Sequence, residues 1–363
     1  MKNPPKTHAG VVKLIRYIIN PEKTSDEQCL YVDSFNCSVV HTASEFKAVR
    51  EKWQKTTGNY AYHFEQSFKP GEVSAEECHQ CGAELAEALF KDLLNMLARH
   101  VTTSVSNTIL VQAQLPDATA VTSIAEWEKR QVPVAKDEDG YYPKGIYQIT
   151  YDGQYADDNG NVHAKYKIYK GYDAVQTVDP DRARAYMNEK PSVNVFYSEP
   201  DKVRNLALVN ASPIKCITYN PDSFIADEEF ISEAEGVKYI PETKTVILRK
   251  IDRSVWFQLV ANQIALGMYH RIDGIKFSVK DRVFEAAIVS CMLSRKMGLS
   301  TEMYHFDLSE LPQKYTPQQF RKMLEQAVEF SKELAFRVNQ RIKQQNQPKS
   351  PKPVYEPQLG VSI

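Results

Sequence analysis

The sequence lacks a long apolar run, and it lacks an excess of charge of either sign. Its 363 residues hold 45 Lys and Arg against 46 Asp and Glu, which gives a formal net charge of −1. Such a chain is no polycation, so any contact with nucleic acid has to come from a local basic patch. No stretch approaches the roughly 18 apolar residues of a membrane-spanning helix, which predicts no membrane partner. The opening MKNPPKTHAG lacks the apolar core of a signal peptide, so we expect a cytoplasmic protein.

Cysteine is also scarce, with six residues in the chain. A cytoplasmic protein keeps its thiols reduced, so no disulfide framework is expected. Cys78 and Cys81 have the spacing of half a zinc site, but no second close pair follows at zinc-ribbon distance. The surrounding SAEECHQCGAELAEAL is typical of a helix capped by Ser74, with Glu77 at the capping-box position. We therefore predict a plain helix here, without structural metal, and no cofactor.

Helical and strand-like patterns alternate irregularly, which predicts an α+β fold. Apolar periodicity indicates helices over 41–53, 74–90, 93–114, 181–188, 200–208, 252–270, 279–297 and 316–343. Strand patterns cover 60–68, 213–219 and two hairpins, at 141–175 and 236–250. Residues 10–19 fit either a strand or a short helix. The tail, 346–363, contains four prolines and is expected to be disordered.

Two stretches near the N-terminus resemble a known family. The strings YIINPEKT (17–24) and HFEQSFKPGEV (63–73) resemble the opening of MobA-type relaxases of plasmids and conjugative transposons. Relaxases of this type nick DNA with a tyrosine and a metal ion held by a histidine cluster, and the resemblance makes Tyr17 the candidate nucleophile. The histidine cluster should follow residue 90, but His100 is the only histidine in the next stretch, 93–112. Without those ligands a metal ion has nothing to bind. We therefore expect a truncated relaxase-like α/β segment over 1–92, in which Tyr17 is either a vestigial nucleophile or a strand tyrosine beside a turn.

A second resemblance begins where the first ends. The strings SVSNTIL (104–110) and QLPDAT (114–119), with Trp127 and the hairpin at 236–250, are similar to ArdC-type antirestriction proteins. That family joins a single-stranded-DNA-binding domain to a zincin-like metallopeptidase domain. The resemblance implies a mixed α+β DNA-binding domain over 93–225 and a helical zincin-like domain over 226–345.

The predicted helix at 252–270 lacks the metal ligands of this second family, whose helix reads His-Glu-x-x-His. Asn262 stands at the first ligand position, Gln263 at the general base and Leu266 at the second ligand; Ala287 takes the third ligand position in the next helix. Zinc needs imidazole, thiolate or carboxylate ligands, and a carboxamide cannot take a proton from bound water. We predict an inert domain without metal, in which Leu266 belongs to a buried helix. Two polar residues keep their places: His270, expected to be a surface or capping histidine, and Glu285.

Tyrosine and lysine are concentrated in the hairpin predicted over 141–175. Single-stranded DNA is held by aromatic stacking together with a positive groove. Alternation along the second strand puts Lys165, Lys167 and Tyr169 on one face. With Tyr147 from the first strand, these are the candidate DNA-binding residues. The alternative is that tyrosine is abundant here because it favours strands.

Three functions remain open from the sequence. The first is a non-catalytic, single-stranded-DNA-binding accessory protein of a mobile genetic element, which works with the conjugation or restriction machinery. The second is a DNA-nicking enzyme of the relaxase type that uses Tyr17. The third is an inactive recombination remnant whose halves join near residues 90–94.

Overall fold

The computed structural model describes residues 5–20, 22, 42–52, 72–156, 162–188, 201–218, 236–248, 255–309 and 311–346. Within these ranges the fold is mixed α+β, as the sequence predicts. The strand expected at 60–68 and the tail beyond Asn346 lie outside the described residues. No helix in the described part is both long and apolar enough to cross a membrane.

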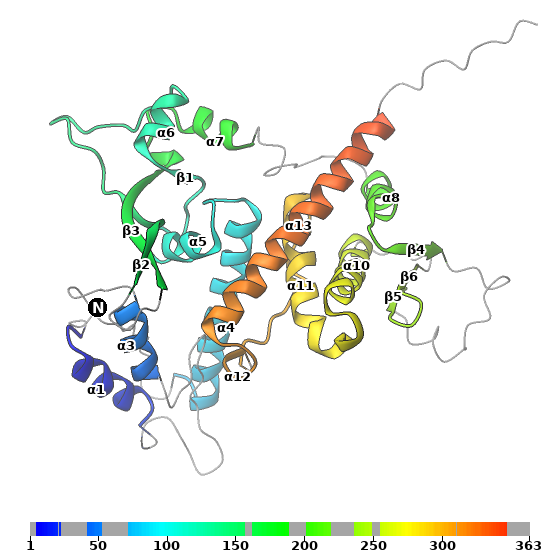
Figure 1. Ribbon diagram of the computed structural model, residues 1–363, viewed down its shortest axis with the longest axis horizontal. Coiled ribbons are helices and arrows are strands. Elements are labelled where there is room, and N and C mark those ends of the chain that lie inside the picture. Colours follow the sequence, from blue (N-terminus) through cyan, green and yellow to red (C-terminus); the bar gives the residue numbers. More distant parts are fainter. Residues whose placement is uncertain are drawn as a thin grey trace, which may run out of the picture.

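Helices make up most of the described chain (Figure 1). Those before the first long strand are α1 (His8–Ile18), α3 (Thr42–Lys52), α4 (Ala75–Ala98), α5 (Val105–Gln112) and α6 (Ile124–Lys129). Those after it are α7 (Pro180–Asn188), α8 (Asp201–Ala211), α10 (Trp256–Asp273), α11 (Val279–Lys296), α12 (Leu311–Lys314) and α13 (Pro317–Asn346). Short 3₁₀ turns are η1 (Ala174–Gln176) and η2 (Gly274–Lys276).

Two small three-stranded sheets lie on opposite sides of the helices in Figure 1. The first is antiparallel, with the order β1 (Val121–Thr122), β3 (Val162–Asp173), β2 (Ile146–Ala156). The second has β6 (Thr245–Leu248) at its centre, parallel to β4 (Lys215–Thr218) and antiparallel to β5 (Val237–Ile240). Both predicted hairpins are therefore confirmed.

Residues 10–19 belong to helix α1 rather than to a strand. The Thr7 hydroxyl accepts a hydrogen bond from the backbone N–H of Gly10 at 3.1 Å, which satisfies one of the amides that a helix start leaves unpaired. The single helix predicted at 93–114 is divided between two helices in the structure. Its first part belongs to α4, and a turn at 99–104 separates α4 from α5.

Helix α4 is shared between two hydrophobic cores. Phe90, Leu94 and Leu97 are buried in the largest core, against helices of the C-terminal part. Met96 instead packs with Val101 and neighbours beneath the first sheet. The Phe90 ring contacts Phe284, Phe306 and Phe320. The expected junction at residues 90–94 consequently falls inside one continuous helix whose second half is built into the C-terminal core.

Candidate functional site

The β2–β3 hairpin exposes a row of tyrosines on one face. The strand register places Tyr147 opposite Lys170 and Tyr151 opposite Tyr166. The Lys170 ammonium lies 5.9 Å from the centre of the Tyr147 ring, and the rings of Tyr151 and Tyr166 meet edge to face with centroids 6.1 Å apart. Tyr147 is 50% exposed, Tyr151 56%, Tyr166 41% and Ile168 67%. We call these five residues the tyrosine face.

The opposite face of the hairpin carries Lys165, Lys167 and Tyr169, and we call it the lysine face. A bulge in β2 between Tyr151 and Gln154 brings the Asp152 carboxylate to 3.2 Å from the Lys167 ammonium and 3.6 Å from that of Lys165. The hydrogen bond from Lys167 is the main reason that the pKa of Asp152 is lowered. One carboxylate against two ammonium groups leaves the lysine face with one net positive charge.

Tyr169 is partly buried on the lysine face. Its hydroxyl donates to Gln148 Oε1 at 3.0 Å, and burial raises the pKa of the phenol. This ring is thus less accessible for stacking than Tyr147, Tyr151 and Tyr166.

The four residues predicted to bind DNA accordingly lie on two faces. Lys165, Lys167 and Tyr169 share a face, as alternation predicts, but Tyr147 lies on the other. Tyr151 and Tyr166 were missed as site residues. Their signal was present in the alternation, but pairing them required the strand register, which the sequence does not specify.

Two carboxamides hold the outer edge of β2 against α5. The Asn107 side chain donates to the carbonyl of Ile149 and accepts from its N–H, at 3.0 and 2.9 Å. Gln114 pairs with Tyr147 in the same way, with both distances at 2.9 Å. Each amide imitates one residue of a neighbouring strand, so this part of the edge is closed to another strand and the hairpin is anchored at its base.

In α10 and α11, structural residues occupy the positions at which the sequence resemblance predicts lost metal ligands. Leu266 is buried at 3% exposure, and the partly buried Ala287 packs against the same core. Gln263 Oε1 accepts from the backbone N–H of Tyr239 at 2.8 Å, while its Nε2 donates to Asn262 Oδ1 at 3.0 Å. The carboxamides thus join the helix to β5.

His270, the histidine that keeps its place, is half-buried rather than exposed. Its Nδ1 lies 2.8 Å from the Tyr239 hydroxyl, and its ring stacks on Phe277 with centroids 4.3 Å apart. These contacts tie the end of α10 to β5, so His270 has a structural role.

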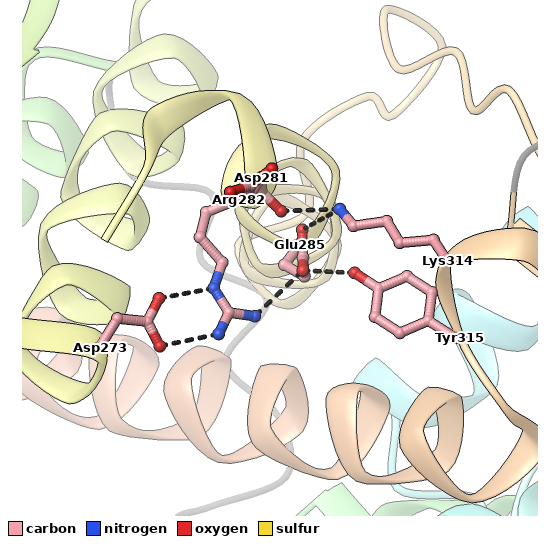
Figure 2. A network of polar contacts seen from close by, with 6 residues as sticks. All are labelled: Asp273, Asp281, Arg282, Glu285, Lys314 and Tyr315. Carbon is pink, nitrogen blue, oxygen red and sulfur yellow. Dashed lines mark hydrogen bonds and ion pairs between the residues drawn. The ribbon is translucent and has the colours of Figure 1, made fainter. Parts of the chain in front are cut away.

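Glu285 is buried at the centre of an ion network between α10, α11 and α12 (Figure 2). Its Oε1 accepts from Arg282 Nη1 at 3.1 Å and from the Tyr315 hydroxyl, and Lys314 Nζ lies 3.6 Å from Oε2. Arg282 also binds Asp273 through two parallel hydrogen bonds, at 2.7 and 2.8 Å. Two carboxylates and two cations balance one another, which favours a structural clamp over a vacant ligand set.

The remaining candidates are scattered. Tyr17 lies in the last turn of α1 and is 49% exposed, so it is a helical tyrosine and not a strand one. Cys78 and Cys81 lie on α4 as free thiols. In the described part of the chain, no three His, Cys, Asp or Glu side chains are grouped so as to hold a metal ion.

Comparison with known proteins identifies the N-terminal segment. Residues 17–104 match the family model described as relaxase, MobA/VirD2-like, nuclease domain. Two proteins named rlx from Staphylococcus aureus are 43% identical over 74 residues and 40% identical over 84 residues. The first alignment covers 20% of this chain and 21% of the relative, and the second covers 23% and 25%. The chain therefore spans at most a quarter of the length of either relative.

Two crystal structures of the antirestriction protein ArdC from plasmid R388 are also similar. The metal-free form has a TM-score of 0.40 at 13% identity, over 72% of this chain and 98% of that one. The Mn(II)-bound form has a TM-score of 0.38 at 14% identity, over 66% of this chain and 83% of that one.

The match to the relaxase family model extends past the predicted boundary at residue 92 and through the end of α4. Residues 17–104 are therefore similar to the nuclease domain of MobA/VirD2-like relaxases.

Proposed function

We propose that this protein is a non-catalytic, single-stranded-DNA-binding accessory of a mobile genetic element, acting in conjugative transfer or in antirestriction. The observation that carries the proposal is the tyrosine face. Three exposed rings and Ile168 lie on one side of a hairpin whose base is held rigidly by Asn107 and Gln114. A rigid set of exposed rings is what unpaired bases stack on, regardless of their sequence.

Charge around the hairpin supports the same ligand. Lys170 adds a cation to the tyrosine face, and the lysine face keeps one net positive charge. These ammonium groups would displace the cations condensed on the phosphates of a bound strand, so binding should weaken as salt increases. Duplex DNA hides its bases inside the helix and offers the rings nothing to stack on.

The setting of the function comes from the sequence. The relaxase-like match covers residues 17–104, and relaxases process DNA during transfer of mobile elements. The motifs at 104–119 resemble the start of ArdC-type antirestriction proteins. Both favour a DNA-processing or antirestriction role for the whole chain.

The non-catalytic part of the proposal rests on residue types in α10 and α11. Leu266 and Ala287 have no donor atom for a metal, and Gln263 cannot act as a base. The hydrogen bond from Tyr239 gives Gln263 a structural role.

A binding experiment tests the proposal. Fluorescence anisotropy with a labelled single strand and with the matching duplex measures both affinities. Tyr151→Ala should weaken single-strand binding by roughly 5- to 150-fold, because a stacked base contributes about 1–3 kcal/mol. Tyr141→Ala is the matched control, since Tyr141 is 71% exposed and lies outside both strands. Equal losses in the two variants, or no preference for the single strand, would contradict the proposal.

A relaxase-type nicking enzyme is the second candidate, favoured by a family match that includes Tyr17. Supercoiled plasmid incubated with the protein and Mg²⁺ or Mn²⁺ tests it. Nicking that Tyr17→Phe abolishes would establish this candidate, whereas the non-catalytic proposal expects supercoiled DNA to remain intact.

A further inference from the structure

Basic side chains gather where α4 and α11 end. Arg99 forms the C-cap of α4, and Arg295 lies in the last turn of α11. Arg295 Nε donates to Asn95 Oδ1 at 2.7 Å. Lys296 Nζ donates to the carbonyl of Ala98 at 2.6 Å.

His100 completes the group, with its Nε2 at 2.9 Å from Lys296 Nζ. We call Arg99, His100, Arg295 and Lys296 the basic junction. Residues of the N-terminal relaxase-like match and of the last third of the chain thus meet in one basic group.

The cations of the basic junction outnumber the carboxylates available to them. Within the described ranges, none of Arg99, Arg295 and Lys296 forms an ion pair with an acidic side chain, and the Arg99 side chain makes no hydrogen bond. Burial lowers the pKa of Arg99, and the neighbouring charge of Arg295 lowers it further. Burial likewise lowers the pKa of Lys296 to about 7, with a smaller contribution from Lys332.

Asp173 is the carboxylate whose charge opposes that of Arg99, but its oxygens are already used. They accept the backbone N–H groups of Thr119 and Ala120, at 2.7 and 2.9 Å, and that of Val175 at 3.0 Å. Asp173 is the last residue of β3, so the basic junction lies near the base of the β2–β3 hairpin.

Helix dipoles explain only part of this arrangement. A cation at a helix C-terminus is favoured, and the bond from Lys296 to the Ala98 carbonyl is an example. Arg99 and Arg295 add two guanidinium groups to the same place, and each repels the other. An anion placed between them would remove that repulsion. Guanidinium groups match the oxygens of a phosphate with two parallel hydrogen bonds.

We propose that the basic junction is a phosphate-binding site in which Arg99 and Arg295 hold the anion. The source of the phosphate is the backbone of the DNA strand bound at the hairpin, and this part of the inference rests on the proposed function. The basic junction then binds the DNA strand at a second point, through its phosphate charge and independently of the base sequence.

Titration with inorganic phosphate and pyrophosphate, at ionic strength matched with chloride, tests the site itself. The full chain should gain thermal stability on binding. Arg99→Gln and Arg295→Gln should each bind at least tenfold more weakly. Arg337→Gln is the matched control, because Arg337 pairs with Glu333 on α13. Circular dichroism confirms that each variant is folded, and equal phosphate binding in the folded variants and the wild type would overturn the proposal.

The salt dependence of oligonucleotide binding tests the source of the phosphate. Arg99→Gln should reduce the slope of log K against log salt by about 0.7, the value for one phosphate of a single strand. An unchanged slope would overturn the assignment to the DNA backbone, even where the hairpin variants bind DNA poorly. If the wild-type protein binds no DNA, the proposed function fails, while the phosphate titration still decides the site.

Discussion

The side chain of Gln263 accepts a hydrogen bond from the backbone N–H of Tyr239 at 2.8 Å, and so connects α10 to β5. The sequence resemblance predicts that Gln263 stands where zincin-type peptidases have a glutamate as general base. A glutamate carboxylate could still accept that bond, but only the glutamine can also donate to Asn262, as its Nε2 does. Substitutions at these positions test the structural role against the predicted loss of a metal site.

Metal content tests the inert-domain prediction. Purified protein should carry no stoichiometric zinc, and a chelator should leave its Tm unchanged, because no metal-binding free energy is linked to folding. The combined changes Asn262→His, Gln263→Glu, Leu266→His and Ala287→Glu should recruit zinc if the backbone holds the geometry of a zincin metal site. Elemental analysis measures both proteins, and one equivalent of tightly held zinc in the unaltered protein would show the prediction to be wrong.

Leu266→His alone should only destabilise the fold. The side chain is 3% exposed, so the change removes buried apolar contacts and places an unpaired ring among apolar neighbours. We expect a loss of about 3 kcal/mol in the free energy of unfolding, compared with less than about 1.5 kcal/mol for the volume-conserving control Leu266→Met. Denaturant titration measures both, and similar values for the two variants would contradict the burial argument.

The ion network in α10, α11 and α12 should depend strongly on the buried Glu285. Glu285→Gln keeps the shape but removes the buried charge that pairs with the half-buried Arg282 and the exposed Lys314, and loss of a hydrogen bond to a charged group costs about 1.5–3 kcal/mol. Glu329→Gln, on the exposed face of α13, removes an ion pair with Lys332 and should cost less than about 1 kcal/mol. Chemical denaturation compares them; equal effects would mean that the network contributes no more than a surface pair.

Lys296 should make stability depend on pH. Because burial lowers the pKa of Lys296 to about 7 from the ordinary 10.5, between these values the unfolded chain binds the proton and the folded protein does not. The free energy of unfolding of the wild type should therefore rise from pH 7 to pH 10 relative to that of Lys296→Met. Denaturant unfolding at several pH values measures the difference, and parallel profiles would argue against a lowered pKa.

Truncation tests whether α4 belongs to the C-terminal core. A chain that begins at residue 93 loses Phe90, whose ring is 2% exposed and touches three other phenylalanines. Removal of one such ring costs about 3–5 kcal/mol. A chain that begins at residue 72 keeps the whole of α4 and should have the higher Tm by calorimetry. Equal Tm values would support an independent domain that starts at residue 93.

Local pattern was sufficient to predict most elements. The capping box at Ser74 and Glu77 is present as predicted, with bonds of 2.7 and 3.1 Å. The two hairpins and the helices α10, α11 and α13 were also predicted within a few residues. These features depend on hydrogen bonds and apolar periods that span only a few residues, so the sequence by itself determines them.

Relations between distant residues were decided by the tertiary structure alone. Pairing of β2 with β3 put Tyr147 beside Lys170 and away from Lys165 and Lys167. Packing brought Lys296 to His100, a contact across 196 residues of chain. Register and packing are set by the free energy of the whole core and not by any local spacing. The sequence therefore determined where tyrosine and lysine alternate along the strands, and the fold decided which of them share a face.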